Sequence, residues 1–334
     1  MSTADHMRTV PLTIERTARP TISMHDPRLH PGEPLSTGIS RIAVGRTDRA
    51  IRALTKSTAD FDDALHRARK AMKRLRALLR LVRDEIGYQT YREENHVLRE
   101  ASRKLGPARD SFVLVVTLEQ IVADYEELLT PGAFELTDRH LRAAHRASID
   151  DLMSGRQTLS HVVTTLEAAR SRYQAWATAL RADASPFLRD EYNAVAPGLG
   201  RIYRRSRNDL ERAITKGTNA TFHEWRRSTK YLRYQMETLQ PIWPDVVGGH
   251  AARLDELGEL LGNDHDLFVL ADTVREEPGA CPNPTARRLL VALIDQARVD
   301  LQEEALTLGT SLYSEKPKAF VTRIGGYWRT ARGA

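Results

Sequence analysis

The stretch HRARKAMKRLRALLRLVR, residues 66–83, decides how the rest of the chain is interpreted. No acidic residue occurs between Asp63 and Asp84. At about 100° per residue, the histidine and most of the cations share one face of a helix, within an arc of about 120°, and the aliphatic residues share the opposite face. The basic face, the first stripe, consists of His66, Arg69, Lys70, Lys73, Arg76 and Arg80. The pattern predicts a helix that packs on one side and is cationic on the other.

A second copy of this pattern follows 157 residues later. Its opposite face is again apolar and carries Trp225, Leu232, Met236 and Leu239. The second stripe consists of His223, Arg226, Arg227, Lys230 and Arg233. Two matching stripes in one chain are harder to attribute to a solvated helix surface than a single one would be.

The composition suits a soluble globular protein that prefers polyanionic partners. The chain has 334 residues, of which 28% are charged and 41% hydrophobic, and its net charge is +6. Its single cysteine, Cys281, excludes a disulfide scaffold and a multi-cysteine zinc site. The longest apolar run, residues 289–294, is too short to span a bilayer, and no secretory signal opens the chain. We therefore expect a cytoplasmic protein without a membrane segment.

Helical patterns separated by turn signals predict an all-α fold. Residues 1–35 carry five prolines and little periodicity, which predicts a flexible leader. Sustained alternation, the mark of a strand, is absent from the rest of the chain. Glycine and proline predict the breaks between helices. These signals fall at Gly87, 106–107, 131–132, Gly155, 185–186, Gly217, 241–244, 248–249, Gly262, 278–284 and 316–317.

The punctuation divides residues 36–332 into two similar halves, 37–183 and 186–332. A second pair of matching segments supports the division, because LGPARDSFV at 105–113 matches LGNDHDLFV at 261–269 with an offset of 156. The spacing predicts a duplicated unit of two helical bundles related by a pseudo-twofold axis. If the copies pack face to face, the stripes share one groove or channel; if they pack back to back, the surfaces are separate. The sequence leaves both arrangements open.

These residues resemble the CHAD family, the conserved-histidine α-helical domain. The resemblance rests on HRARKAMKRLR at 66–76, HEWRRSTKYLRY at 223–234 and the two Leu-Gly segments, and it extends over about residues 37–332. It implies two four-helix-like bundles around a central basic channel, binding of inorganic polyphosphate, and an association with polyphosphate granules. One departure is His265, which stands where the first copy has Arg109. The second half is therefore expected to contact its ligand differently at that position.

Charge repulsion within the stripes also favours an anionic ligand. Like charges at i and i+4 cost a few tenths of a kcal/mol per pair, and interleaved glutamates would relieve them. Polyphosphate offers repeated charge and acceptor oxygens without bases, which suits arginine forks and lysine point charges. Beyond the stripes, the candidate contacts are Arg109 and, from the helices that open each half, Arg46, Arg201, Arg204 and Arg205.

Four residues with possible chemistry have competing interpretations. His66 and His223 could contact phosphate, bind a metal or be ordinary helix residues; phosphate contact is favoured over metal, because cationic neighbours repel a divalent ion. Those neighbours should also lower the histidine pKa values. Asp110 and Asp266 could be catalytic, but pairing with a stripe arginine or capping a helix is the simpler interpretation.

The sequence favours binding without turnover. It contains no glycine-rich phosphate loop, no evident nucleophile–base grouping and no acidic cluster placed to hold Mg²⁺. No cofactor is expected. One alternative is a nucleic-acid-binding protein that uses the same basic faces, against which the low aromatic content of 6% argues mildly. A lesser alternative is a metal-dependent phosphohydrolase.

Overall fold

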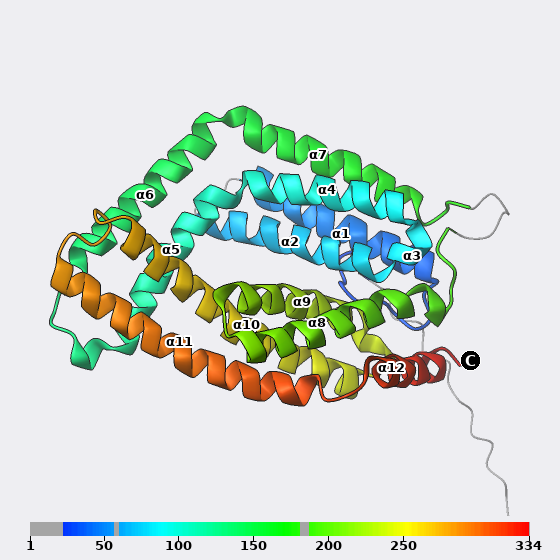
Figure 1. Cartoon of the computed structure of the whole chain (residues 1–334). Coiled ribbons are helices and arrows are strands. Elements are labelled where there is room, and N and C mark those ends of the chain that lie inside the picture. The colour runs from blue at the N-terminus through cyan, green and yellow to red at the C-terminus, as the bar shows by residue number, and fades with distance from the viewer. Residues whose placement is uncertain (1–22, 57–59, 181–186, 334) are drawn as a thin grey trace, which may run out of the picture.

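The computed structural model describes residues 23–56, 60–180 and 187–333, and within them it contains twelve α-helices, three short 3₁₀ helices and no β-strand (Figure 1). The all-α prediction is thus confirmed. The α-helices are α1 (Leu35–Thr55), α2 (Phe61–Leu81), α3 (Arg83–Ile86), α4 (Tyr88–Lys104), α5 (Gly106–Asp124), α6 (Glu135–Ser154), α7 (Arg156–Ala175), α8 (Ala196–Lys216), α9 (Asn219–Leu239), α10 (Pro244–Glu276), α11 (Pro284–Leu312) and α12 (Pro317–Arg332). The 3₁₀ helices are η1 (Glu126–Leu128), η2 (Tyr192–Ala194) and η3 (Gln240–Ile242).

Helices α2 and α9 carry the two stripes, and each begins at a side-chain cap. Asp60 accepts a hydrogen bond from the backbone N–H of Asp63 at the start of α2. Thr218 and Thr221 form a reciprocal capping box at the start of α9. The faces opposite the stripes are buried, with Met72 and Trp225 fully enclosed. Burial of a side chain of this size contributes about 1.5–3 kcal/mol, so packing fixes which face remains open.

The two stripe helices pack against each other in the middle of the molecule. Helix α2 also contacts α1 and α4, and α9 also contacts α8 and α10. Gly198 of α8 allows an especially close approach to the end of α2, because a Cβ there would lie 2.6 Å from the carbonyl oxygen of Arg80 and closer still to that of Leu81. One hydrophobic core joins buried residues from α1 and α2 with residues from α8, α9 and α12.

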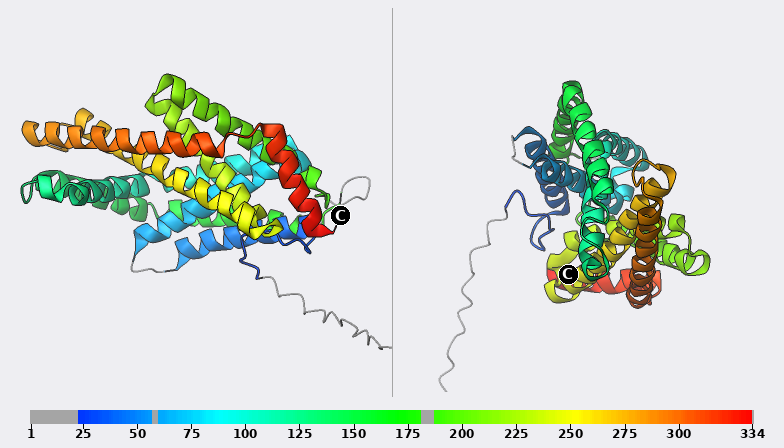
Figure 2. Two further views of the ribbon diagram at one scale, coloured as in Figure 1. Left: turned by 90° about the horizontal axis from the view of Figure 1, so that it is seen from below. Right: turned by 90° about the vertical axis from the view of Figure 1, so that its left-hand side faces the viewer.

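A second, smaller core lies in an extension at one end of the bundle. Helices α5 and α6 and helices α10 and α11 project beyond the others at this end (Figure 2). Their buried contacts include Val115 and Leu118 of α5, Leu141 of α6, Leu270 of α10 and Ile294 of α11. The extension therefore combines helices from both predicted halves.

The breaks predicted at 248–249 and Gly262 are wrong, because α10 runs without interruption through both. The matching element in the first half does break, between α4 and α5. The difference lies in the following residue. Pro107 lacks an N–H and clashes with the preceding turn, whereas Asn263 can continue the helix. The other predicted breaks coincide with helix ends, except 185–186, which lies outside the described residues.

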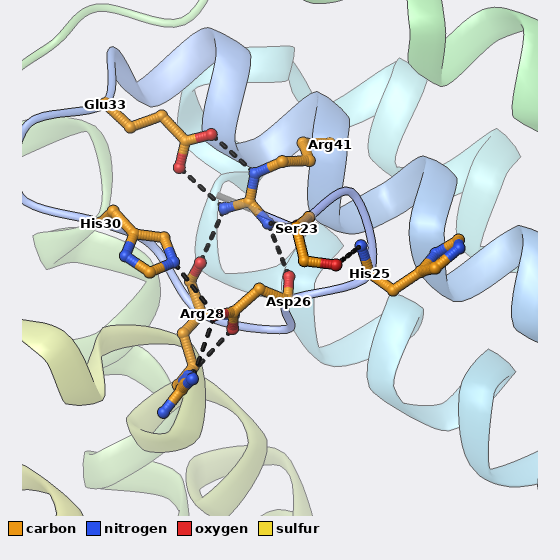
Figure 3. A network of polar contacts seen from close by, with 7 residues as sticks. All are labelled: Ser23, His25, Asp26, Arg28, His30, Glu33 and Arg41. Atoms are coloured by element: carbon orange, nitrogen blue, oxygen red, sulfur yellow. Dashed lines mark hydrogen bonds and ion pairs between the residues drawn. The ribbon is translucent and has the colours of Figure 1, made fainter. Parts of the chain in front are cut away.

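The predicted flexible leader differs from the structure over residues 23–34, which are anchored to the bundle; residues 1–22 lie outside the described residues. Buried Arg41 of α1 holds the segment: it donates to both carboxylate oxygens of Glu33 at 2.7 Å and to the backbone oxygens of Asp26 and Arg28 at 2.6 and 2.8 Å (Figure 3). Leu29 is buried, and its N–H donates to the carbonyl of Thr238 at 2.8 Å. The prolines and the lack of helical periodicity predicted a flexible segment. Neither feature reveals these tertiary contacts.

No helix in the described part of the chain is long and apolar enough to cross a bilayer.

Candidate functional site

Both stripes line one cavity of about 650 Å³, called here the central cavity, between α2, α5, α9 and α10. Of the two arrangements that the sequence left open, the stripes therefore face a shared space. Nine lysines and arginines but only three carboxylates line it, so the wall has a large excess of positive charge. The predicted site residues in this wall are His66, Arg69, Lys70, Lys73, Arg76, Arg109, His223, Arg226, Arg227, Lys230 and Arg233.

Four cations in the wall make no hydrogen bond or ion pair with any described residue: Lys70, Lys73, Arg109 and Lys230. Loss of water around its ammonium, together with Arg69, Lys230 and Arg226, lowers the pKa of Lys73 to about 7. Burial and Arg226 lower the pKa of Lys230 to about 8. The side chain of Lys73 is exposed to the cavity, but protein surrounds the cavity on several sides, which is why the ammonium loses water. An anion entering the cavity would relieve a repulsion that Asp110, Asp266 and Glu259 offset only in part.

Two arginines at equivalent positions are partly neutralised by the two aspartates of the Leu-Gly segments. Arg69 donates to the carboxylate of Asp110 at 3.2 Å and to the carbonyl oxygen of Ser102 at 3.1 Å. Arg226 lies 3.6 Å from the carboxylate of Asp266, and its buried Nε has no hydrogen-bond partner in the part of the chain that the structure describes. Burial raises the pKa of Asp266 even though Arg226 opposes the shift. The prediction that these aspartates pair with stripe arginines is confirmed for both.

Three histidines share the central cavity. Burial first, and then Arg109 and the nearby lysines, lower the pKa of His66 to about 4. The Nδ1 atoms of His223 and His265 lie 3.3 Å apart, and burial with neighbouring Arg226 lowers the pKa of both, that of His265 to about 3. The predicted decrease is confirmed, although burial is a larger cause than the cationic neighbours. Within the part of the chain that the structure describes, no cluster of three or more histidine, cysteine or acidic side chains could hold a metal ion.

The two stripes differ in the partners of one pair of equivalent arginines. Arg76 donates from Nε to the amide oxygen of Asn95 at 3.0 Å, a neutral partner. Arg233, at the equivalent position of α9, pairs with Asp255 and with Glu237 at 3.0 Å. The positive charge of Arg76 thus stays uncompensated, whereas that of Arg233 is neutralised.

Five predicted site residues do not line the central cavity: Arg46, Arg80, Arg201, Arg204 and Arg205. Arg80 lies behind its wall, with its guanidinium 4.1 Å from the centre of the Tyr231 ring. Arg46 is buried, which lowers its pKa to about 9. The helical face was inferred correctly for Arg80, but side chains from other helices cover it.

The remaining three lie on α8. Arg201 donates to the Asp84 carboxylate at 2.7 Å and Arg205 to that of Glu224 at 2.7 Å. Arg204 is exposed, and with Arg201 it lines a different cavity.

Several wall residues were not singled out from the sequence: Tyr231, Tyr234, Val113, Leu114, Val269 and Glu259. The first two directly follow stripe positions and could have been found from that adjacency. The three aliphatic residues belong to or follow the Leu-Gly segments at matching spacing. Glu259 has no local signal, because only the packing of α10 against α9 brings it to the cavity.

Comparisons with known proteins agree with this architecture. The family model described as CHAD domain matches residues 44–275. The solved structure titled "PptA from Streptomyces chartreusis" is similar at a TM-score of 0.60 and 17% identity, and the match covers 85% of this chain and all of that one. The CHAD domain from the plant Ricinus communis is similar at a TM-score of 0.54 and 19% identity, covering 92% of this chain and 94% of that one. At these identities the two structures show a shared fold. No curated protein matches the sequence.

Proposed function

Because the chain belongs to the CHAD domain family, we propose that it binds inorganic polyphosphate in the central cavity without turning it over. The single observation that carries the proposal is the pair Lys73 and Lys230. They come from equivalent positions of two helices, line the same cavity and lack an anionic partner among the described residues. A polyanion site needs cations that are already positioned close together before the ligand binds, despite their mutual repulsion.

Phosphate oxygens match the donors in the wall. Arginine can bind two oxygens of one phosphate through its planar fork, and lysine acts as a point charge. Charge-assisted hydrogen bonds contribute about 1.5–3 kcal/mol each before the costs of desolvation and ordering. Several such contacts on each stripe would give tight binding. A chain that carries a charge on every unit could engage both stripes at once.

Nucleic acid is less suited to this wall, because its bases would need aromatic faces on which to stack. The cavity contains two tyrosines, and arginines already cover them. Arg80 lies over Tyr231, and both Arg74 and Arg233 lie over Tyr234 at 5.1 and 5.4 Å. Polyphosphate has no bases, so it needs only cations and hydrogen-bond donors in the wall. In competition, excess long-chain polyphosphate should displace RNA easily, and RNA should displace polyphosphate poorly.

Binding without turnover is supported by how the acids of the cavity are used. Metal-assisted phosphoryl transfer needs carboxylates that are free to hold a divalent cation. Asp110 and Asp266 are instead engaged with Arg69 and Arg226. We therefore propose a polyphosphate-binding protein of the cytoplasm, associated with polyphosphate granules, and expect no phosphate release from polyphosphate or triphosphate with Mg²⁺ or Mn²⁺.

The test is a variant in which Arg69, Lys73, Arg226 and Lys230 are all replaced by Ala. It should lose measurable polyphosphate binding in calorimetry while its circular dichroism stays helical, because the four side chains face the cavity rather than the core. The control replaces four cations outside the cavity, Arg49, Arg146, Arg287 and Arg288, and should bind as wild type does. Unchanged affinity in the cavity variant would end the proposal, and equal loss in both variants would reduce it to a net-charge effect.

A further inference from the structure

A second cavity, called here the side cavity, has a volume of about 530 Å³ and lies between α8 and α12. Three cations line it, Arg201 and Arg204 from α8 and Lys318 from α12, and none of the described residues in its wall is an aspartate or glutamate. Arg204 and Lys318 are exposed, and neither makes a hydrogen bond or ion pair with a described residue. The side cavity is therefore positive, and two of its three cations have no acidic partner among the described residues.

A row of arginines joins the two cavities. It starts at Arg76 in the wall of the central cavity, and Arg80 donates to the backbone oxygen of Arg76 at 2.8 Å. Burial is the main cause of the lowered pKa of Arg80, and the positive charges of Arg76 and Arg205 lower it further. Arg205 therefore lies near Arg80. Arg205 in turn follows Arg201 by one helical turn, and Arg201 lines the side cavity.

A second link runs through Glu224. It accepts hydrogen bonds from Arg205 at 2.7 Å and from Arg227 of the central cavity at 2.6 Å. The carboxylate therefore lies between Arg227, which lines the central cavity, and Arg205, which belongs to the row. Asp84 holds Arg201 in a similar way. Both acids are partly exposed, so phosphate oxygens could replace them as partners of these arginines without leaving a buried charge unpaired.

We propose that the side cavity is the second part of one extended polyanion site. A polyphosphate chain too long for the central cavity continues past Arg227 and Arg205 and ends against Arg204 and Lys318. This extension rests on the proposed function and adds to it a structural basis for preferring long chains. Because polyphosphate repeats one charged unit, each unit placed on the row gains contacts of the same kind as the last.

The experiment compares tripolyphosphate, which is short enough to stay in the central cavity, with long-chain polyphosphate, using calorimetry on the full chain. The variant Arg204→Ala/Lys318→Ala removes the two unpaired cations of the side cavity. Its control is Arg287→Ala/Arg288→Ala, which removes the same charge at the start of α11, at the opposite end of the molecule from α12 (Figure 1). All four side chains are free of hydrogen bonds and ion pairs with described residues, so each variant should fold normally.

We expect the side-cavity variant to bind tripolyphosphate as wild type does and long-chain polyphosphate at least about tenfold more weakly, with a shallower salt dependence. The control should match wild type for both anions. If the side-cavity variant keeps its full affinity for the long chain, or loses the same factor for both lengths, the extension is overturned while the central site stands. If wild type binds neither anion, the proposed function fails and the extension fails with it.

Discussion

Lys73 and Lys230 lead to a prediction about pH, because a bound anion should reverse the shifts that burial and neighbouring cations impose on their pKa values. In the free protein their pKa values are lowered to about 7 and about 8. Bound phosphate favours the charged ammonium and raises both values, so binding takes up protons. Affinity should therefore increase as pH falls through about 8 and then about 7, and level off below. Titration calorimetry in buffers of different ionisation enthalpy would measure the protons taken up.

Variants of the same lysines separate this cause from other titrations. Replacing both Lys73 and Lys230 by Gln should weaken binding and flatten its dependence on pH above about 6.5, since the pKa values of the histidines in the cavity are lowered from their usual value of about 6.5. A pH dependence of undiminished slope in the double variant would assign the effect to other groups.

The lysines should also affect stability in the free protein. Their folded pKa values lie below the value of about 10.4 expected in the unfolded chain, so folding is opposed while they are charged, and their penalty decreases as pH rises above about 7. Lys73→Met should raise the melting temperature of the ligand-free protein at neutral pH and weaken polyphosphate binding, a trade of function for stability. Differential scanning calorimetry with and without polyphosphate tests both signs. A lower melting temperature for the ligand-free variant would contradict the predicted repulsion.

Residue periodicity identified most of the central cavity and failed where another helix intervenes. The 100° pattern placed His66 and Lys73 on one face correctly, since that depends on a single helix. It could not show that Tyr231 of α9 and Asn95 of α4 would occupy the space in front of Arg80. It also could not show that Arg76 would have a neutral partner and Arg233 an acidic one.

That last difference predicts that the equivalent arginines of α2 and α9 are not interchangeable. Arg76→Ala should weaken polyphosphate binding, because a cation without an acidic partner is lost from the wall. Arg233→Ala should change binding less and lower the free energy of unfolding by about 1–3 kcal/mol, because a buried residue loses its pairs with Asp255 and Glu237. Binding and urea-unfolding measurements on both variants test this prediction. Equal losses of binding would mean that the ligand displaces Asp255 and Glu237 from Arg233.

At the scale of elements, the residue that follows the glycine of each Leu-Gly segment, Pro107 or Asn263, determined whether the helix breaks there. Glycine costs a helix about 1 kcal/mol, which tertiary packing can exceed, and the interior glycines of α10 accordingly do not end it. Proline costs about 3 kcal/mol, and α4 ends before Gly106-Pro107. The breaks predicted at 248–249 and Gly262 were wrong because glycine was treated as a helix-breaking signal as strong as proline. The core contacts that keep α10 continuous cannot be inferred from its local sequence.

Two glycines provide a matched test of helix packing. A Cβ at Gly198 would collide with backbone carbonyls at the end of α2, so Gly198→Ala should force α8 away and cost at least about 1–3 kcal/mol. A Cβ at Gly249 of α10 would meet open space, so Gly249→Ala should instead stabilise the helix by about 0.5–1 kcal/mol. Urea midpoints of the two variants should move in opposite directions. A neutral Gly198→Ala would show that the α2–α8 contact is looser than described.

At the scale of the whole molecule, the sequence repeat suggests two units, whereas the packing suggests one. The stripe helices α2 and α9 contact each other, and the end of α2 lies against Gly198 of α8. The main core draws on both halves, and the extension combines α5 and α6 with α10 and α11. Repeat detection finds similarity between segments but carries no information on how much surface the copies bury against each other. The repeat boundaries 37–183 and 186–332 therefore need not be folding boundaries.

This packing predicts that neither half folds alone. Separated, residues 23–183 would expose the apolar surface of α2 that α8 and α9 cover, and residues 187–333 would expose the matching surfaces together with half of the extension core. That surface is worth about 25 cal/mol per Å², enough to exceed the marginal stability of a small domain. Each fragment should show reduced helical circular dichroism, and mixing them should restore it. The intact chain should unfold in one calorimetric transition with equal calorimetric and van't Hoff enthalpies. Two fragments that are fully helical apart would instead mean that the cavity forms by docking of independent bundles, and its affinity would then depend on the strength of that interface.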